Sequence, residues 1–393
     1  MNMTEKTAEN ETDPINQEVS RMADGAPTRL ISSPFDIKIE TLDRMLNFEI
    51  ADDPIYSGLE IQGFDDDEHG RGMLVFLQRR DSEKTDVYYE AGLKLNPKLY
   101  AVGGGLGVWK ECRFDKVQLD ISEISGVYAE AIFRDIDGRL IQVHVEDSTP
   151  LKGRMAHNFL APVGAAISKP QSLMLVNMTD FDLMRRAGPE PEILIDGKSA
   201  SPGSLPAETC LGRRLIKIAK DLCIVTMNPI DTGERVKMMS EETIQTEAEG
   251  INTITKALEG HKASLCFDPP FPNVSTLFGN EVSGKWRIEI DDLPSVVSGH
   301  WSIAPTNEGS DVKVKMEVNT GWRPKGLPLL MKFVTTIVPV FRNWPETYQW
   351  VATVHHGDLT MHAQWERTTS DRGESYQAMS GTKKRGKEMN PKK

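Results

Sequence analysis

The stretch VKVKMEVN, Val312 to Asn319, alternates apolar and polar side chains at every position. Side chains two residues apart point to the same face of a β-strand, so this segment has one apolar and one charged face. The stretch KWRIEID, Lys285 to Asp291, has the same period. The pattern is typical of antiparallel strands that pack on a core with one face and meet water with the other.

Asp-Gly pairs stand where hairpins need a turn, at Asp137-Gly138 and at Asp196-Gly197. Many short alternating segments with polar turns predict a mainly β protein built of antiparallel barrels or sandwiches. The chain has 393 residues, which is long for one core, so we expect two domains.

Changes in composition place the expected domain boundaries. Residues 1–33 and 368–393 are poor in apolar side chains, which predicts a disordered acidic arm and a disordered basic tail. Residues 237–262 are rich in helix formers and predict a short helical connector. The connector would join a β domain over 34–236 to a tryptophan-rich β domain over 263–367.

The segment 326–345 contains a strongly apolar run, Leu329 to Val338, between Pro328 and Pro339. It predicts a short helix or a buried strand. As a helix, it would plug a barrel end or lie on a membrane surface. Only Lys332 supplies a basic side chain inside the run, which favours the plug.

Composition and charge exclude several classes of protein. A formal net charge of -12 argues against a general affinity for nucleic acids. The four cysteines show no CxxC pairing and are expected to be free thiols in a reducing compartment. No run of 18 apolar residues and no signal peptide are visible, so we expect a soluble cytoplasmic protein without a spanning segment.

The glycine-rich stretch LYAVGGGLGVWKE, Leu99 to Glu111, does not fit a nucleotide-binding loop. The residues after it have the pattern of a strand, so no helix N-terminus is available to hold a phosphate. The loop is expected to be a bend, and no cofactor is predicted. Histidines and cysteines show no convincing metal-ligand spacing, so no metal is predicted either.

The tripeptides Gly107-Val108-Trp109 and Gly284-Lys285-Trp286 each begin a predicted strand. A Gly-x-Trp at the first strand of a barrel resembles the short signature of lipocalin-type folds. Two copies resemble two-domain lipocalin-like proteins of the carotenoid hydratase (hydroxyneurosporene synthase) type. The resemblance implies two cup-shaped barrels, each closed at one end by its tryptophan. Only about five strands fit from Trp286 onward, so earlier strands must complete the second barrel.

A hairpin is predicted in YQWVATVHHGDLTMHAQWER, with its turn at Gly357-Asp358. Its facing pairs then share one side of the hairpin: Trp350 with Trp365, Ala352 with Ala363, Val354 with Met361, and His356 with Leu359. Two alanines between two tryptophans make a shallow dip, which either packs in a core or receives a ligand.

Two functional hypotheses follow, although no recognisable catalytic motif is present. In the first, a barrel cavity binds an apolar small molecule such as an isoprenoid, lipid or polyketide, and polar groups catalyse cofactor-free hydration, cyclisation or isomerisation. The candidate acid–base residues are His356, Tyr89 and Glu111. The candidate ligand contacts are Trp109, Trp286, Trp350, Ala352, Met361, Ala363 and Trp365. In the second, an exposed tryptophan-rich face binds another protein without catalysis.

Overall fold

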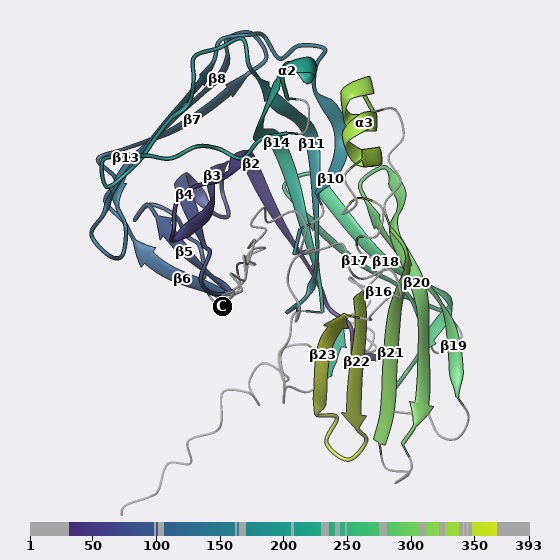
Figure 1. Cartoon of the computed structure of the whole chain (residues 1–393). Coiled ribbons are helices and arrows are strands. Elements are labelled where there is room, and N and C mark those ends of the chain that lie inside the picture. The colour runs from purple at the N-terminus through teal and green to yellow at the C-terminus, as the bar shows by residue number, and fades with distance from the viewer. Residues whose placement is uncertain are drawn as a thin grey trace, which may run out of the picture.

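The fold is mainly β, with three large sheets and two short helices in the described part of the chain (Figure 1). The computed structural model describes residues 31–97, 100, 106–161, 163–164, 170–205, 208–228, 236–239, 244–247, 250–274, 281–306, 311–321, 327–337, 341, 344 and 348–367. The predicted basic tail, nearly all of the acidic arm and the three consecutive glycines at 103–105 lie outside these residues.

An eight-stranded sheet, here the central sheet, has the strand order β10-β11-β14-β2-β3-β4-β5-β6. Neighbouring strands are antiparallel except β5 and β6, which are parallel. The bounds are β2 Ile37–Glu49, β3 Tyr56–Asp66, β4 Gly70–Arg79, β5 Lys84–Tyr89, β6 Leu106–Glu111, β10 Ala156–Ala161, β11 Leu173–Arg185 and β14 Arg213–Met227.

A five-stranded sheet, here the cover sheet, has the order β13-β12-β9-β8-β7. Its strands are β7 Lys116–Ser122, β8 Gly126–Arg134, β9 Leu140–Asp147, β12 Glu192–Ile195 and β13 Lys198–Ser199. Two further short strands, β1 Ile31–Ser33 and β15 Lys237–Met239, pair with each other. A single helical turn, α2 Glu208–Leu211, precedes β14.

The C-terminal sheet has eight antiparallel strands in sequence order. They are β16 Ile244–Glu247, β17 Gly250–Leu258, β18 His261–Pro272, β19 Val282–Ile290, β20 Leu293–Pro305, β21 Asp311–Thr320, β22 Tyr348–His355 and β23 Met361–Arg367. Three strands before β19 complete the sheet, which confirms that the five strands from Trp286 onward are too few on their own.

One face of the central sheet is covered twice. Ile216 and Ile218 of β14 belong to the core shared with the cover sheet, whereas Val225 and Met227 belong to the core shared with the C-terminal sheet. Figure 1 shows β2, β11 and β14 running from the cover sheet toward the C-terminal sheet. These long strands therefore belong to both halves of the molecule.

The change between the two cores occurs at Asp221. Ala219 and Leu222 lie three residues apart yet belong to the same core cluster, on the opposite face. Strict alternation would put them on different faces. Asp221 between them has a φ of 51°, in the left-handed region that Asp tolerates better than most residues. This conformation rotates the strand at the boundary.

The expected helical connector over 237–262 is wrong. That range contains β15, β16 and β17. The segment has helix-forming residues, but Ile251 and Ile254 are fully buried in the core of the C-terminal sheet. Burial of β-branched side chains on a pleated surface outweighs the small free-energy differences of intrinsic helix propensity.

The predicted hairpin is confirmed in three of its four facing pairs: Trp350 with Trp365, Ala352 with Ala363 and Val354 with Met361. The two-residue turn that would pair His356 with Leu359 is wrong. The His355 N–H donates to the Thr360 carbonyl and the Leu359 N–H donates to the His355 carbonyl, so His356 and Leu359 both lie within a longer turn. The apolar run forms a helix rather than a strand, α3 Leu329–Ile337.

One side of α3 packs on the central sheet through Met331, while Leu329 is 85% exposed and Phe333 46% exposed on the other side. In the described part of the chain, neither helix has the length and apolarity needed to cross a membrane.

His261 joins the central and C-terminal sheets at the Asp221 boundary. Its Nε2 lies 3.0 Å from Asp221 Oδ1, and its Nδ1 lies 2.8 Å from Asp291 Oδ2. Burial alone lowers the pKa of His261, but the two carboxylates outweigh burial and raise it above its ordinary value.

We predict that His261→Gln weakens the fold in a pH-dependent way. A raised pKa in the folded state stabilises the protein fully below about pH 6.5, and this stabilisation is lost as pH rises through the raised pKa. The variant should lose about 1 kcal/mol of unfolding free energy at pH 6 and less at higher pH. Urea unfolding across this pH range measures the difference. The more exposed His157, paired with Asp180, gives the control variant His157→Gln. A difference independent of pH would mean that His261 acts by packing alone.

Candidate functional site

The face of the central sheet opposite the cover sheet carries an acid among aromatic side chains, and we call it the Glu60 face. Strand register places one row of side chains across six neighbouring strands of this face. The row is Lys217, Asn47, Glu60, Phe76, Val87 and Trp109. Polar groups thus occupy one half of the row and apolar groups the other.

The adjacent row contains two of the candidate site residues, Tyr89 and Glu111. Gln62 pairs with Leu74, Leu74 with Tyr89, and Tyr89 with Glu111. The structure therefore brings the candidate acid–base residues Tyr89 and Glu111 together with the candidate ligand contact Trp109. Tyr89 and Trp109 are half-buried, and Glu111 is exposed at the edge of the sheet.

Glu60 lies at the centre of a chain of hydrogen bonds. Asn47 Nδ2 donates to Glu60 Oε2 at 2.9 Å, and Gln62 Nε2 donates to Glu60 Oε1 at 2.5 Å. Lys217 Nζ donates to Asn47 Oδ1 at 3.0 Å, and the Tyr100 hydroxyl donates to Gln62 Oε1 at 2.7 Å. Each amide is held in one orientation because its oxygen accepts a bond from Lys217 or Tyr100. Both carboxyl oxygens of Glu60 are thereby fixed in place.

Burial raises the pKa of Glu60 above its ordinary value. The bonds from Gln62 and Asn47 and the charge of Lys217 lower it, but they do not outweigh burial. The environment thus favours a protonated carboxyl more than water does. Raising the pKa of a carboxyl makes it better suited to act as a proton donor.

Aromatic rings border the acid on the side of β6. The Tyr100 ring stands edge-on to Trp109 with centroids 5.9 Å apart, and the Tyr89 ring lies 6.1 Å from Trp109. Phe64 lies 6.1 Å from Tyr100. These rings present an apolar wall with edge-to-face geometry next to the polar chain.

The other end of the Glu60 face is covered by side chains from distant segments. Phe159 of β10 stacks on Phe181 of β11 with centroids 4.4 Å apart, and Phe341 meets Phe159 edge-on. Met331 of α3 and Leu327 before it are buried in the same cluster. The strands β21 and β22 belong to the C-terminal sheet, and the connection between them therefore reaches over the Glu60 face.

The candidate residues of the C-terminal domain lie in a different place. Trp286, Trp350, Ala352, Ala363 and Trp365 are buried in the core of the C-terminal sheet, and Met361 packs against that core. The Trp286 Nε1 donates to the His300 and Glu317 carbonyls, and the Trp365 Nε1 donates to the Asn228 carbonyl. His356 is half-buried in the turn of the β22–β23 hairpin. The structure does not bring these residues together with Tyr89 and Glu111.

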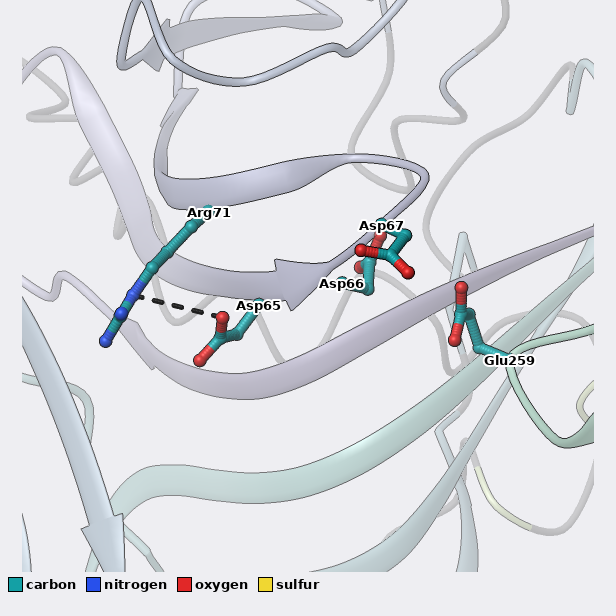
Figure 2. A pocket seen from close by; sticks show the side chains of 5 residues that line it. All are labelled: Asp65, Asp66, Asp67, Arg71 and Glu259. Carbon is teal, nitrogen blue, oxygen red and sulfur yellow. Dashed lines mark ion pairs between the residues drawn. The ribbon is translucent and has the colours of Figure 1, made fainter.

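A shallow acidic pocket lies where the β3–β4 turn meets the β17–β18 turn (Figure 2). It is lined by Asp65, Asp66, Asp67, Arg71 and Glu259, with a volume of about 420 Å³. Arg71 Nε stands 3.9 Å from Asp65 Oδ1. Asp66 is also engaged by His69, whose Nδ1 lies 3.0 Å away. Charged walls of this kind do not suit an apolar ligand.

No cluster of three or more histidine, cysteine or acidic side chains in the described residues is arranged to hold a metal ion.

Pattern analysis missed Glu60, Gln62, Asn47, Lys217 and Tyr100. In GLEIQGF the buried core residues Leu59 and Ile61 alternate with Glu60 and Gln62, so the polar positions are typical of a solvated face. The one available signal is Phe64, an apolar ring in phase with the two polar side chains. It indicates that this side of the strand is also covered.

No protein-family model, no curated protein and no solved structure matches the chain. The chemistry of the Glu60 face therefore rests on its own geometry.

We predict that Glu60→Gln becomes more stable relative to the parent protein as pH rises. A carboxyl whose pKa is raised in the folded state stabilises the fold below its unfolded value near 4.3, and loses that contribution as pH rises through the folded pKa. The uncharged amide has no such loss. The gain should be about 1.4 kcal/mol for each unit by which the pKa is raised.

Chemical denaturation between about pH 4.5 and pH 8 measures this difference. Glu130→Gln is the control of opposite sign, because hydrogen bonds from Lys116 and Tyr128 hold the pKa of Glu130 below its ordinary value. If Glu60→Gln shows no pH-dependent gain, Glu60 is ionised in the folded protein and the acid assignment is wrong.

Proposed function

We propose that the chain binds an apolar small molecule against the Glu60 face and that Glu60 protonates it. The substrate class is an isoprenoid, lipid or polyketide-like molecule, and the reaction is a cofactor-free hydration, cyclisation or isomerisation. One observation carries the proposal. The Glu60 carboxyl has a raised pKa and accepts hydrogen bonds from the side-chain amides of Asn47 and Gln62. Glu60 lies in the same row as Phe76, Val87 and Trp109.

The chemistry requires a proton donor and a way to hold the charge that remains. Protonation of an alkene by Glu60 leaves a carboxylate on the protein and a carbocation on the ligand. The amides of Asn47 and Gln62 and the charge of Lys217 stabilise the carboxylate. The face of the Trp109 ring is suited to stabilise a nearby cation.

Three outcomes then correspond to the three reactions. Water addition to the cation gives a hydrated product, attack by a second alkene gives a ring, and loss of a different proton gives an isomer. Glu60 is regenerated when the carboxylate takes up the proton that the reaction releases. Tyr89 and Glu111, in the adjacent row, are placed to contact the ligand or to relay protons at the exposed edge.

The proposal includes a lipocalin-like arrangement of the two halves and a cytoplasmic location. Two sheets of eight strands support the first. The first Gly-x-Trp copy, however, lies on β6, the last strand of the central sheet rather than the first strand of a barrel. Cys112, Cys223 and Cys266 are unpaired thiols, which supports a reducing compartment.

The alternative function, a protein-interaction module with an exposed tryptophan-rich face, has less support. Trp286, Trp301, Trp344, Trp350 and Trp365 are at most 4% exposed. Among the described residues, the exposed large apolar side chains of the C-terminal half are instead Leu329 and Phe333 of α3.

We predict that a C15 isoprenoid alcohol quenches the fluorescence of Trp109 and binds in the micromolar range, about -8 kcal/mol. Trp109→Phe should remove the quenching, because the tryptophans of the C-terminal core lie elsewhere. His356→Ala separates the two candidate places: it should leave binding unchanged if the ligand lies on the Glu60 face. The opposite result would move the site to the C-terminal hairpin: His356→Ala no longer binds the ligand, while Trp109→Phe binds it normally and loses only its share of the fluorescence.

Turnover is tested by deuterium uptake from D₂O into the bound ligand, followed by mass spectrometry. Glu60→Gln should bind within about threefold of the parent protein, yet lose about 100-fold or more in deuterium uptake, the usual contribution of a general acid. Equal uptake in the variant would remove Glu60 from the mechanism. Absence of both binding and uptake in the parent protein would leave the proposal without support.

A further inference from the structure

Five arginines gather at the end of the central sheet farthest from the C-terminal sheet. Arg185 ends β11, Arg213 and Arg214 begin β14, and Arg154 precedes β10. Arg186 follows Arg185 directly. Four carboxylates lie at ion-pair distance from these arginines: Asp147, Asp182, Glu190 and Glu208. This corner thus has an excess positive charge in a chain whose formal net charge is -12.

Four of the five arginines have a carboxylate partner. Arg214 lies 2.6 Å from Glu190 and Arg186 lies 3.2 Å from Glu208.

Asp182 is shared by the other two. Arg154 approaches it to 2.9 Å and Arg213 to 3.5 Å. Within the described chain, the guanidinium of Arg185 has no carboxylate at ion-pair distance.

Arg185 also faces a like charge. It stands directly opposite Arg213 in the ladder between β11 and β14. Burial, and then the neighbouring charges of Arg154 and Arg185, lower the pKa of Arg213 despite the attraction of Asp182. Like charges at a directly opposed pair of strand positions destabilise a sheet unless a counter-charge lies between them.

Hydrogen bonding leaves Arg185 incomplete as well. The Nε of Arg185 is buried and has no hydrogen-bond partner in the described chain, whereas the Nε of Arg213 has only the long contact of 3.5 Å with Asp182 Oδ1. A buried donor without an acceptor costs about 1–3 kcal/mol, and more when the group is charged. Buried donors in folded proteins are nearly always satisfied by the protein, by ordered water or by a bound ion.

We infer that Arg185 and Arg213, with Arg154 beside them, form a binding site for an oxyanion, either a carboxylate or a phosphate group. Guanidinium groups match both in geometry, because their planar donors bind two oxygens at once. One anionic group neutralises the excess charge, separates the opposed arginines and accepts from the buried donors. The site is distinct from the Glu60 acid and does not depend on the proposed reaction.

The test is isothermal titration of the full chain with inorganic phosphate and with acetate, at ionic strength held constant with sodium chloride. We expect saturable binding of at least one anion. Arg185→Gln should weaken it about tenfold or more. Arg186→Gln is the matched control, because Arg186 is adjacent but already paired with Glu208, and it should bind within about twofold of the parent protein.

Thermal unfolding without added anion guards against a misfolded variant. Removal of an uncompensated charge should leave the Tm of Arg185→Gln equal to or above that of the parent protein. A titration with dodecyl phosphate then distinguishes a free anion from the head group of a larger molecule: tighter binding than inorganic phosphate indicates the head group, and equal binding indicates the free anion. If neither phosphate nor acetate binds saturably, or if Arg185→Gln binds them as well as the parent does, the site does not exist.

Discussion

The double coverage of one face of the central sheet is the constraint on which the rest of the structure depends. The strands β2, β11 and β14 are long enough to pack against the cover sheet at one end and the C-terminal sheet at the other. An apolar sheet face this large must be buried, since each Å² of apolar surface removed from water stabilises the fold by about 25 cal/mol. Once two sheets have taken that face, the opposite face has only loops, α3 and its own neighbouring strands to cover it. Polar and half-buried side chains such as Lys217, Asn47 and Glu60 are tolerated there for that reason.

A buried charged cluster fixes the central sheet against the cover sheet. The Tyr56 hydroxyl lies 3.2 Å from Asp86 Oδ2 and 3.1 Å from Asp135 Oδ2. Arg79 pairs with Asp86, and Arg139 pairs with Asp135 while lying 4.8 Å from the centre of the Tyr56 ring. Burial raises the pKa of Tyr56 first, and both carboxylates raise it further, so the hydroxyl remains a donor. Because Tyr56 and Asp86 belong to β3 and β5, the cluster also holds in register the strands that carry Glu60 and Val87. A functional side chain on rigid strands is positioned more accurately than one on a loop.

Local patterns predict local structure well in this chain and fail where distant segments decide. The alternation over 312–319 and the hairpin of Trp350 and Trp365 are visible in the sequence, because each depends on neighbours within about twenty residues. The apolar run at 329–338 is visible too, but its pattern left helix and buried strand open, and the structure decides for the helix. The Glu60 network is not visible, since Lys217 reaches Asn47 across 170 positions. The pairing of β14 with β2 places Lys217 opposite Asn47. That pairing depends on how the cover sheet and the C-terminal sheet pack on the central sheet. The segment 237–262 fails for the same reason: its strand conformation comes from the core that it joins.

The two polar sites of the central sheet differ in how the protein partners them. Both carboxyl oxygens of Glu60 accept hydrogen bonds from side-chain amides of the protein, and burial nevertheless raises the pKa of the group. Arg185 is the reverse, a cation whose buried donor has no acceptor from the protein. In each case the surroundings do not fully stabilise the charged form, because desolvation disfavours the Glu60 carboxylate and Arg185 has no counter-charge at ion-pair distance among the described residues. The two proposals therefore assign opposite chemistry to the two ends of one sheet: an apolar, proton-accepting molecule at Glu60 and an oxyanion at Arg185.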